Sequence, residues 1–205
     1  IYQETYDKLI LSPGAKPILP PIAGIPNEKV FSLRTIPDTM DIKSYLTQHH
    51  PKSAVVVGGG YIGVEMAENL TKAGISTTIV ELADHLIGPL DRDMACDVHR
   101  YLRGQGVRVL LKQKLKAVRE EGEGLVLTLT GGEMAADMAI MSVGVTPDTT
   151  LAEKAGIAVN PKGCIVVNEQ MQTSFKDIYA VGDAVQISDF VTGKKGFLPL
   201  AGPAN

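Results

Sequence analysis

Gly58, Gly60 and Gly63 form the pattern G-x-G-x-x-G immediately after a short apolar run, residues 54–57. In such a pattern the first glycine permits a tight turn, the second lets a pyrophosphate approach the backbone, and the third lets the next helix pack closely on the sheet. Glu81 follows eighteen residues after Gly63, where dinucleotide-binding folds place a carboxylate that accepts hydrogen bonds from the adenosine ribose. These residue types at this spacing predict a dinucleotide site.

A strand, a turn, a helix and a second strand must position these groups. Residues 54–57 are continuously apolar, as in a parallel strand buried on both faces. A second apolar run, residues 75–80, leads into Glu81. Between the two runs, an apolar stripe at helical spacing ends before Gly74 and comprises Ile62, Met66, Leu70 and Ala73. The N-terminus of this helix would face the phosphates; the alternative is a turn whose glycines serve packing only.

The rest of the pattern predicts an α/β fold, in which a parallel sheet with helices carries a three-strand antiparallel meander. Helices are expected over residues 39–48 and after Asp91, the second with Met94, Ala95, Val98, Tyr101 and Leu102 on its buried face and His99 on the opposite face with Arg100 and Arg103. Further strands are expected at residues 107–111 and 139–143, and the meander at residues 115–119, 125–129 and 133–137.

Outside this region the expected elements are shorter. Residues 16–26 hold four prolines, which favours an extended linker. Strands are expected at residues 6–11, 164–168 and 178–181, and a brief helical turn at residues 151–155.

Composition excludes several classes of function. The net charge is −3 with scattered basic residues, which argues against nucleic-acid binding. No apolar run approaches ~20 residues, and the chain opens without a basic signal-peptide region, so neither a membrane partner nor export is expected. Cys96 and Cys164 lie far from metal-ligand spacing, so we expect no metal site and a reducing, cytoplasmic location. His85, after Glu81, is expected to be exposed and mostly uncharged near neutral pH.

Four blocks resemble the pyridine nucleotide-disulphide oxidoreductases, FAD-dependent reductases with an NAD(P)H-binding domain inserted into an FAD-binding domain. They are YDKLILSPG at residues 6–14, the glycine pattern at 58–63, VGVTPD at 143–148, and TS followed by IYAVGD at 173–183. The SPGAKP block and the ending LPLAGPAN look most similar to coenzyme A-disulfide reductases and related NADH oxidases.

The resemblance implies roles for individual residues. Tyr61 matches a tyrosine that covers the flavin ring, Glu65 a carboxylate near the nicotinamide carboxamide, and Asp183 an aspartate that binds the flavin ribityl chain. Each residue also has a purely structural explanation. Tyr61 could pack at the helix start, Glu65 could be an acid of the first turn that the helix dipole favours, and Asp183 could be an acid in a turn. Motif and resemblance together give these cofactor-binding residues: Gly14, Gly58, Gly60, Tyr61, Ile62, Gly63, Glu65, Glu81, Gly144 and Asp183.

The family's flavin-binding glycine motif, redox-active cysteine and dimerisation domain have no counterpart in this sequence. The expectation is therefore an excised piece: FAD-domain strand and linker at 1–38, an NAD(H)-binding domain at 39–148, and a partial FAD-binding domain at 149–205. No catalytic residue is assigned, and this fragment is expected to be inactive alone and to purify without FAD.

The whole protein, expected to be a homodimer, would pass hydride from NADH to FAD and reduce a small-molecule disulfide or oxygen. Alternatives are a nucleotide-binding module without activity, an NADH-dependent ferredoxin, nitrite or peroxide reductase of the same superfamily, and, less favoured, a dehydrogenase acting directly on a small substrate. NADH is expected to bind better than NADPH, because Glu81 opposes a 2′-phosphate and the first arginine beyond it is Arg92.

Overall fold

The computed structural model describes residues 3–200 of the chain. It divides into two compact units, one continuous from Pro17 to Gly144 and one formed by the described residues on either side of that segment. The last five residues of the LPLAGPAN ending, 201–205, lie outside the described residues.

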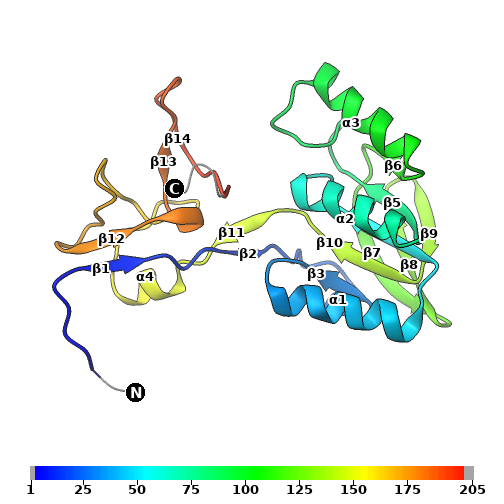
Figure 1. Cartoon of the computed structure of the whole chain (residues 1–205), viewed down its shortest axis with the longest axis horizontal. Coiled ribbons are helices and arrows are strands. Elements are labelled where there is room, and N and C mark those ends of the chain that lie inside the picture. The colour runs from blue at the N-terminus through cyan, green and yellow to red at the C-terminus, as the bar shows by residue number, and fades with distance from the viewer. Residues whose placement is uncertain (1–2, 201–205) are drawn as a thin grey trace. The chain divides into compact units, whose positions relative to one another are not determined.

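A five-stranded parallel sheet forms the centre of the continuous unit, with strand order β3-β10-β4-β5-β6 (Figure 1). The chain runs outward from β4 to β6 and then returns to place β10 on the other side of β4. Loops after strands on the two sides of such a reversal diverge and leave a crevice at the carboxyl edge. The bounds are β3 Val30–Ser32, β4 Ser53–Val57, β5 Ser76–Val80, β6 Arg108–Leu110 and β10 Met138–Met141.

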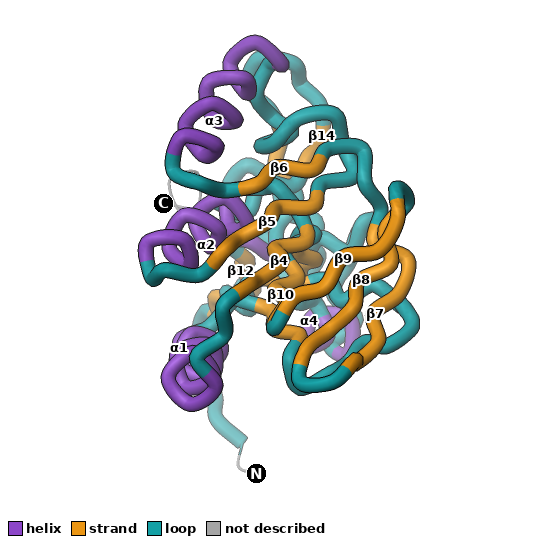
Figure 2. The backbone as a smooth tube through the Cα atoms, turned by 90° about the vertical axis from the view of Figure 1, so that its right-hand side faces the viewer, coloured by secondary structure: helices purple, strands orange, loops and turns teal. Residues whose placement is uncertain are grey.

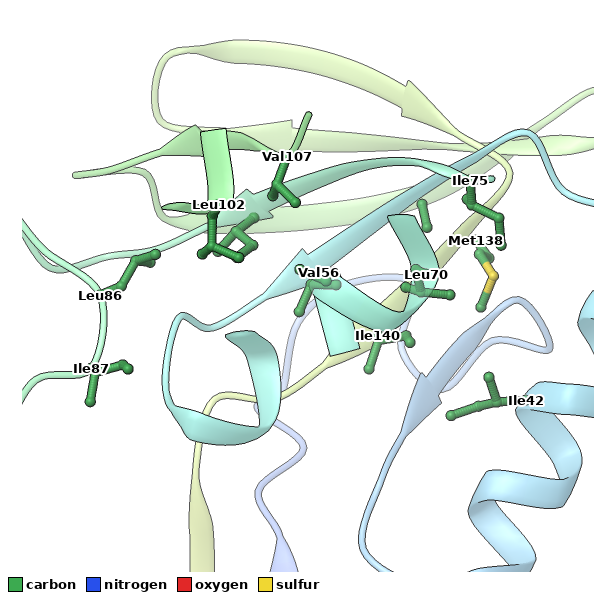
Figure 3. Close-up of a cluster of buried hydrophobic side chains, with 13 residues drawn as sticks. Ile42, Val56, Leu70, Ile75, Leu86, Ile87, Leu102, Val107, Met138 and Ile140 are labelled. Atoms are coloured by element: carbon green, nitrogen blue, oxygen red, sulfur yellow. The ribbon is translucent and has the colours of Figure 1, made fainter. Parts of the chain in front are cut away.

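Helices cover one face of this sheet and the meander covers the other (Figure 2). Val56 packs in a buried cluster with Leu70 and Leu102 from the helices (Figure 3), whereas Val55 packs with Leu127 from the meander. Alternate residues of a strand point to opposite faces, so a continuously apolar strand suits burial on both sides. The helices are α1 Ile36–His49, α2 Tyr61–Lys72 and α3 Arg92–Gly104, and the meander strands are β7 Leu115–Glu121, β8 Gly124–Leu129 and β9 Gly132–Ala136.

Helix α1 begins three residues earlier than expected. The Thr35 hydroxyl accepts a bond from the Asp38 N–H, and the Asp38 carboxylate accepts one from the Thr35 N–H. This reciprocal pair satisfies two N–H groups at the helix start, and Pro37 suits the first turn.

One strand of this unit was not expected, and one expectation is wrong. Strand β3 follows the proline-rich segment 16–26 and pairs with β10 at the sheet edge. On α3 the buried residues are Ala95, His99 and Leu102, whereas Met94 and Tyr101 are more than half exposed. The inward face is therefore rotated toward His99, because loop residues after β5 cover that side of the helix.

The second unit is built on a parallel pair, β1 Leu9–Leu11 with β12 Ile178–Ala180. Its buried cluster includes Leu11, Ile165 and Ala180. The strand expected at residues 164–168 is reduced to single bridges at Ile165. The remaining elements are β2 Ala15–Pro17, β11 Val145–Pro147, α4 Thr150–Lys154, the 3-10 helix η1 Gly182–Ala184, β13 Ile187–Ser188 and β14 Lys195–Gly196.

Within residues 3–200, no helix combines the length and the apolar character needed to cross a membrane.

Candidate functional site

In the turn between β4 and α2, the protein's own backbone requires glycine at positions 58 and 63. Gly58 has φ +107°, and a Cβ there would lie 2.3 Å from the carbonyl oxygen of Ser142. A Cβ at Gly63 would lie 1.9 Å from the carbonyl oxygen of Gly58. These two glycines let β4, α2 and the end of β10 meet closely.

Gly60 differs from both. It is the N-cap residue of α2 with an ordinary φ of −74°, and a Cβ there would meet nothing within 4 Å. The space in front of it is open, at the helix end where free N–H groups and the helix dipole attract anions. No packing requirement within the described residues explains this glycine.

Glu81 is held against the glycine turn by two backbone donors. Its Oε2 accepts from the N–H of Gly59 at 2.6 Å and its Oε1 from the N–H of Ala83 at 2.7 Å. Each carboxylate oxygen keeps a further acceptor position. The acid is thus fixed in place while still able to accept bonds from a ligand.

Ser142 supports the turn from the neighbouring strand and was missed by the sequence reasoning. Its hydroxyl donates to the carbonyl oxygen of Gly58 at 2.9 Å, and its N–H donates to that of Val57 at 2.7 Å. A single serine after an apolar strand carries no recognisable sequence signal. Ser142 reaches the turn only because β10 pairs with β4 in the folded sheet.

A cavity of about 470 Å³ opens at the carboxyl edge of β4, β5 and β10. This is the edge at which open α/β sheets bind ligands. The residues on its wall that matter to the argument are Gly58, Gly60, Glu81, His85, Ser142 and Gly144.

His85 is less exposed than expected, with 19% of its side chain accessible. Its Nδ1 lies 2.7 Å from Oδ1 of Asp84. This hydrogen bond raises the pKa of His85 above 6.5, against the opposing effect of burial. The expectation of an exposed, ordinary histidine is therefore wrong.

The other residues singled out in the sequence lie in different places. Tyr61 and Glu65 are exposed one turn apart on α2, and the intervening Ile62 is half-buried; they lie outside the cavity wall. Gly14 and Asp183 belong to the second unit. Gly14 has φ +72° and its carbonyl accepts from the N–H of Asp148, and Asp183 is part of η1.

A sequence profile of the pyridine nucleotide-disulphide oxidoreductases matches residues 2–197. The chain belongs to this family. The resemblance of the four blocks is thereby confirmed, and curated proteins named NADH oxidase and coenzyme A disulfide reductase are among its relatives. The NADH oxidase of Methanocaldococcus jannaschii is 40% identical over 200 residues, covering 97% of this chain and 44% of that protein. The chain thus spans less than half the length of the curated relatives it matches.

Solved structures of the family share the fold. Reduced Bacillus anthracis CoADR-RHD superposes with a TM-score of 0.94 at 46% identity, covering 100% of this chain and 37% of that one. The water-forming NADH oxidase of Lactobacillus brevis bound to NADH, and its engineered NADPH-bound variant, both give a TM-score of 0.90, at 28% and 27% identity. Each match covers 98% of this chain and 44% of the other. The fold expected from the sequence is confirmed.

Proposed function

We propose that the unit Pro17–Gly144 binds NADH in the cavity at the carboxyl edge of its sheet, and that the whole protein uses it to reduce FAD. The observation that carries the proposal is Glu81, a carboxylate fixed by two backbone donors directly beside the glycine turn. In this position it can accept bonds from both hydroxyls of an adenosine ribose. The pyrophosphate would then lie against Gly60, where the absence of a side chain leaves room for it.

Glu81 also supports a preference for NADH over NADPH. A 2′-phosphate carries nearly two negative charges, and its clash with a carboxylate in a partly buried cavity costs about a hundredfold in affinity. In the engineered NADPH-bound variant of the Lactobacillus brevis oxidase, a glycine and an aspartate eighteen positions apart are both replaced by alanine, and arginine is introduced just after the aspartate. Gly63 and Glu81 have the same separation, and Leu82 follows Glu81.

The second unit would contribute to the flavin side, with Gly14 and Asp183 holding FAD, as the family resemblance implies. Bound FAD would supply the redox chemistry. Tyr61 would cover the flavin ring until the nicotinamide displaces it, and Glu65 would accept a bond from the nicotinamide carboxamide. A small-molecule disulfide or oxygen would be the final acceptor. The 205-residue polypeptide alone would purify without FAD, and an absorption spectrum tests this point.

Calorimetric titration of the chain with NADH and with NADPH tests the nucleotide proposal. We expect NADH to bind more tightly, and Glu81→Gln to weaken NADH binding by about tenfold or more because ribose acceptors are lost. Glu123→Gln is the matched control, since Glu123 is exposed in the turn between β7 and β8. Equal dissociation constants for the two nucleotides, or equal effects of the two substitutions on NADH affinity, would show that Glu81 does not bind the ribose hydroxyls.

A further inference from the structure

His99 makes a buried hydrogen bond that requires its uncharged form. The backbone N–H of Leu86 donates to its Nε2 at 3.0 Å, Leu86 is fully buried, and His99 is 7% exposed. An N–H donor needs a lone pair on Nε2, so the ring proton must be on Nδ1. A charged ring would set two N–H groups against each other.

Leu86 belongs to the segment 82–90, which we call the clamp loop. This loop contacts the glycine turn, residues 58–60, at Gly59. A Cβ at Gly59 would lie 2.2 Å from Cδ2 of Leu86, so that side chain rests directly on Gly59. The N–H of Ile87 donates to the carbonyl oxygen of Gly59 at 2.8 Å. Figure 3 shows Leu86 and Ile87 on this loop at the edge of the buried cluster that contains Leu102.

The clamp loop is held in a strained conformation. Ile87 has φ +51°, in the left-handed region that β-branched residues avoid. Such a conformation persists only where surrounding contacts compensate for it. Contacts that can compensate here include the burial of Leu86 and Ile87 and the bonds to His99 and Gly59.

We infer that His99 is a positioning residue for the nucleotide site, an inference that rests on the proposed function. Its neutral ring anchors Leu86, and the clamp loop in turn fixes Gly59, whose N–H bonds Glu81. His99 lies on α3, outside the wall of the cavity, and acts only through these contacts.

The charges around His99 oppose its protonation. Burial lowers its pKa below 6.5, and Arg103 and His85 lower it further. His85 is itself paired with Asp84, which has Arg92 and Lys112 near it. Neutral His99 is therefore the normal state near pH 7, and nucleotide affinity falls as the pH is lowered from about 6.5 through the depressed pKa, because the charged ring releases Leu86.

Adenosine diphosphate ribose, which carries the ribose and pyrophosphate but no reduced nicotinamide, is a suitable probe. Its dissociation constant is measured by calorimetry from about pH 8 to about pH 5 for the wild type, His99→Gln and, as a control outside the cavity wall, His49→Gln at the exposed end of α1. Glutamine keeps an acceptor near the position of Nε2 and does not titrate. We expect the wild type and His49→Gln to lose about tenfold in affinity across this range, and His99→Gln to lose less than about threefold.

The outcomes separate the two proposals. Binding near pH 8 with the same acid loss in the wild type and His99→Gln overturns the role of His99 and leaves the nucleotide site standing. No binding near pH 8 overturns the nucleotide site. In either case, NMR of the ligand-free chain tests the coupling: the Gly59 amide shift must follow the titration of His99 in the wild type, and a Gly59 amide that ignores it contradicts the inference.

Discussion

The N–H of Gly59 and the carboxylate of Glu81 lie 2.6 Å apart, so the acid that ends β5 is bonded directly to the turn that ends β4. Charged acceptors form short, strong bonds with backbone N–H groups. The places proposed for the phosphates and for the ribose are therefore linked by a direct hydrogen bond, and we expect a substitution at either place to change the geometry of the other.

Gly60→Ala should leave the fold intact and weaken nucleotide binding. The new methyl group meets nothing in the protein, but it fills the space proposed for the pyrophosphate. We expect an unchanged melting temperature and at least a tenfold loss of NADH affinity, about 1.4 kcal/mol. Gly104→Ala, at the exposed end of α3 with similarly open space, is the control. If both variants bind NADH like the wild type, the pyrophosphate does not approach Gly60.

Gly63→Ala should instead destabilise the unit. Its methyl group would collide with the backbone carbonyl of Gly58 at 1.9 Å, and backbone cannot yield as a side chain can. We expect a loss of about 1–3 kcal/mol in the free energy of unfolding, the usual range for overpacking. Ser142→Ala should cost about 1 kcal/mol through the lost bond to Gly58. Urea denaturation measures both, and a Gly63→Ala variant as stable as the wild type would contradict the close packing described.

Cofactor preference should respond to charge at the end of β5. Glu81→Ala combined with Ala83→Arg removes the negative charge and supplies a guanidinium for a 2′-phosphate. The ratio of NADPH to NADH dissociation constants should narrow from about a hundredfold to near one, or reverse. Ala83→Arg alone should change this ratio less, because Glu81 would form an ion pair with the new arginine. Retention of the full NADH preference by the double variant would mean that another residue sets it.

Asp137 should make stability depend on acid pH. Burial alone would raise its pKa, but bonds from the N–H groups of Lys52 and Ser53 and from the Ser53 hydroxyl hold the pKa below 3.8. The carboxylate therefore stabilises the fold at neutral pH, and this contribution is lost as the pH falls through the depressed value.

Asp137→Asn tests this prediction by urea denaturation at several pH values. At neutral pH we expect a loss of about 1.5–3 kcal/mol, as for hydrogen bonds to charged groups, and a smaller dependence on acid pH than in the wild type. Asp97→Asn, in an exposed pair with Arg100, should change stability by less than about 0.5 kcal/mol. Parallel acid profiles for the wild type and Asp137→Asn would rule out this role of Asp137.

The parts of the fold visible in the sequence are those whose signals are local. Strand β4, the glycine turn, helix α2 and Glu81 follow one another within a short segment, and each has a pattern that depends only on its neighbours. Strand β3 could not be recognised, because three residues become a strand only by pairing with β10 more than a hundred residues later.

The same reason explains what was missed in the site. Ser142 reaches Gly58, and His99 reaches Leu86, through contacts between segments that no periodicity records. His99 was placed on the wrong face of α3 because a polar residue in a helical stripe reads as outward-facing. Its inward orientation is explained by the hydrogen bond that its Nε2 accepts from the buried N–H of Leu86.

The N–H of Ile18 donates to the carbonyl oxygen of Gly144 at 3.0 Å, so the unit Pro17–Gly144 begins and ends at the same point. The folded unit therefore connects the two flanking segments through ends that lie next to each other. These segments carry β1 and β12, which pair Leu9 with Ile178 although the residues are far apart in the sequence. A disordered loop of that length would cost entropy on closure. Once the inserted unit has folded, that cost is already met. During synthesis the parallel pairing of β1 with β12 should therefore follow folding of the inner unit, and only the segments that flank the unit then remain to be closed.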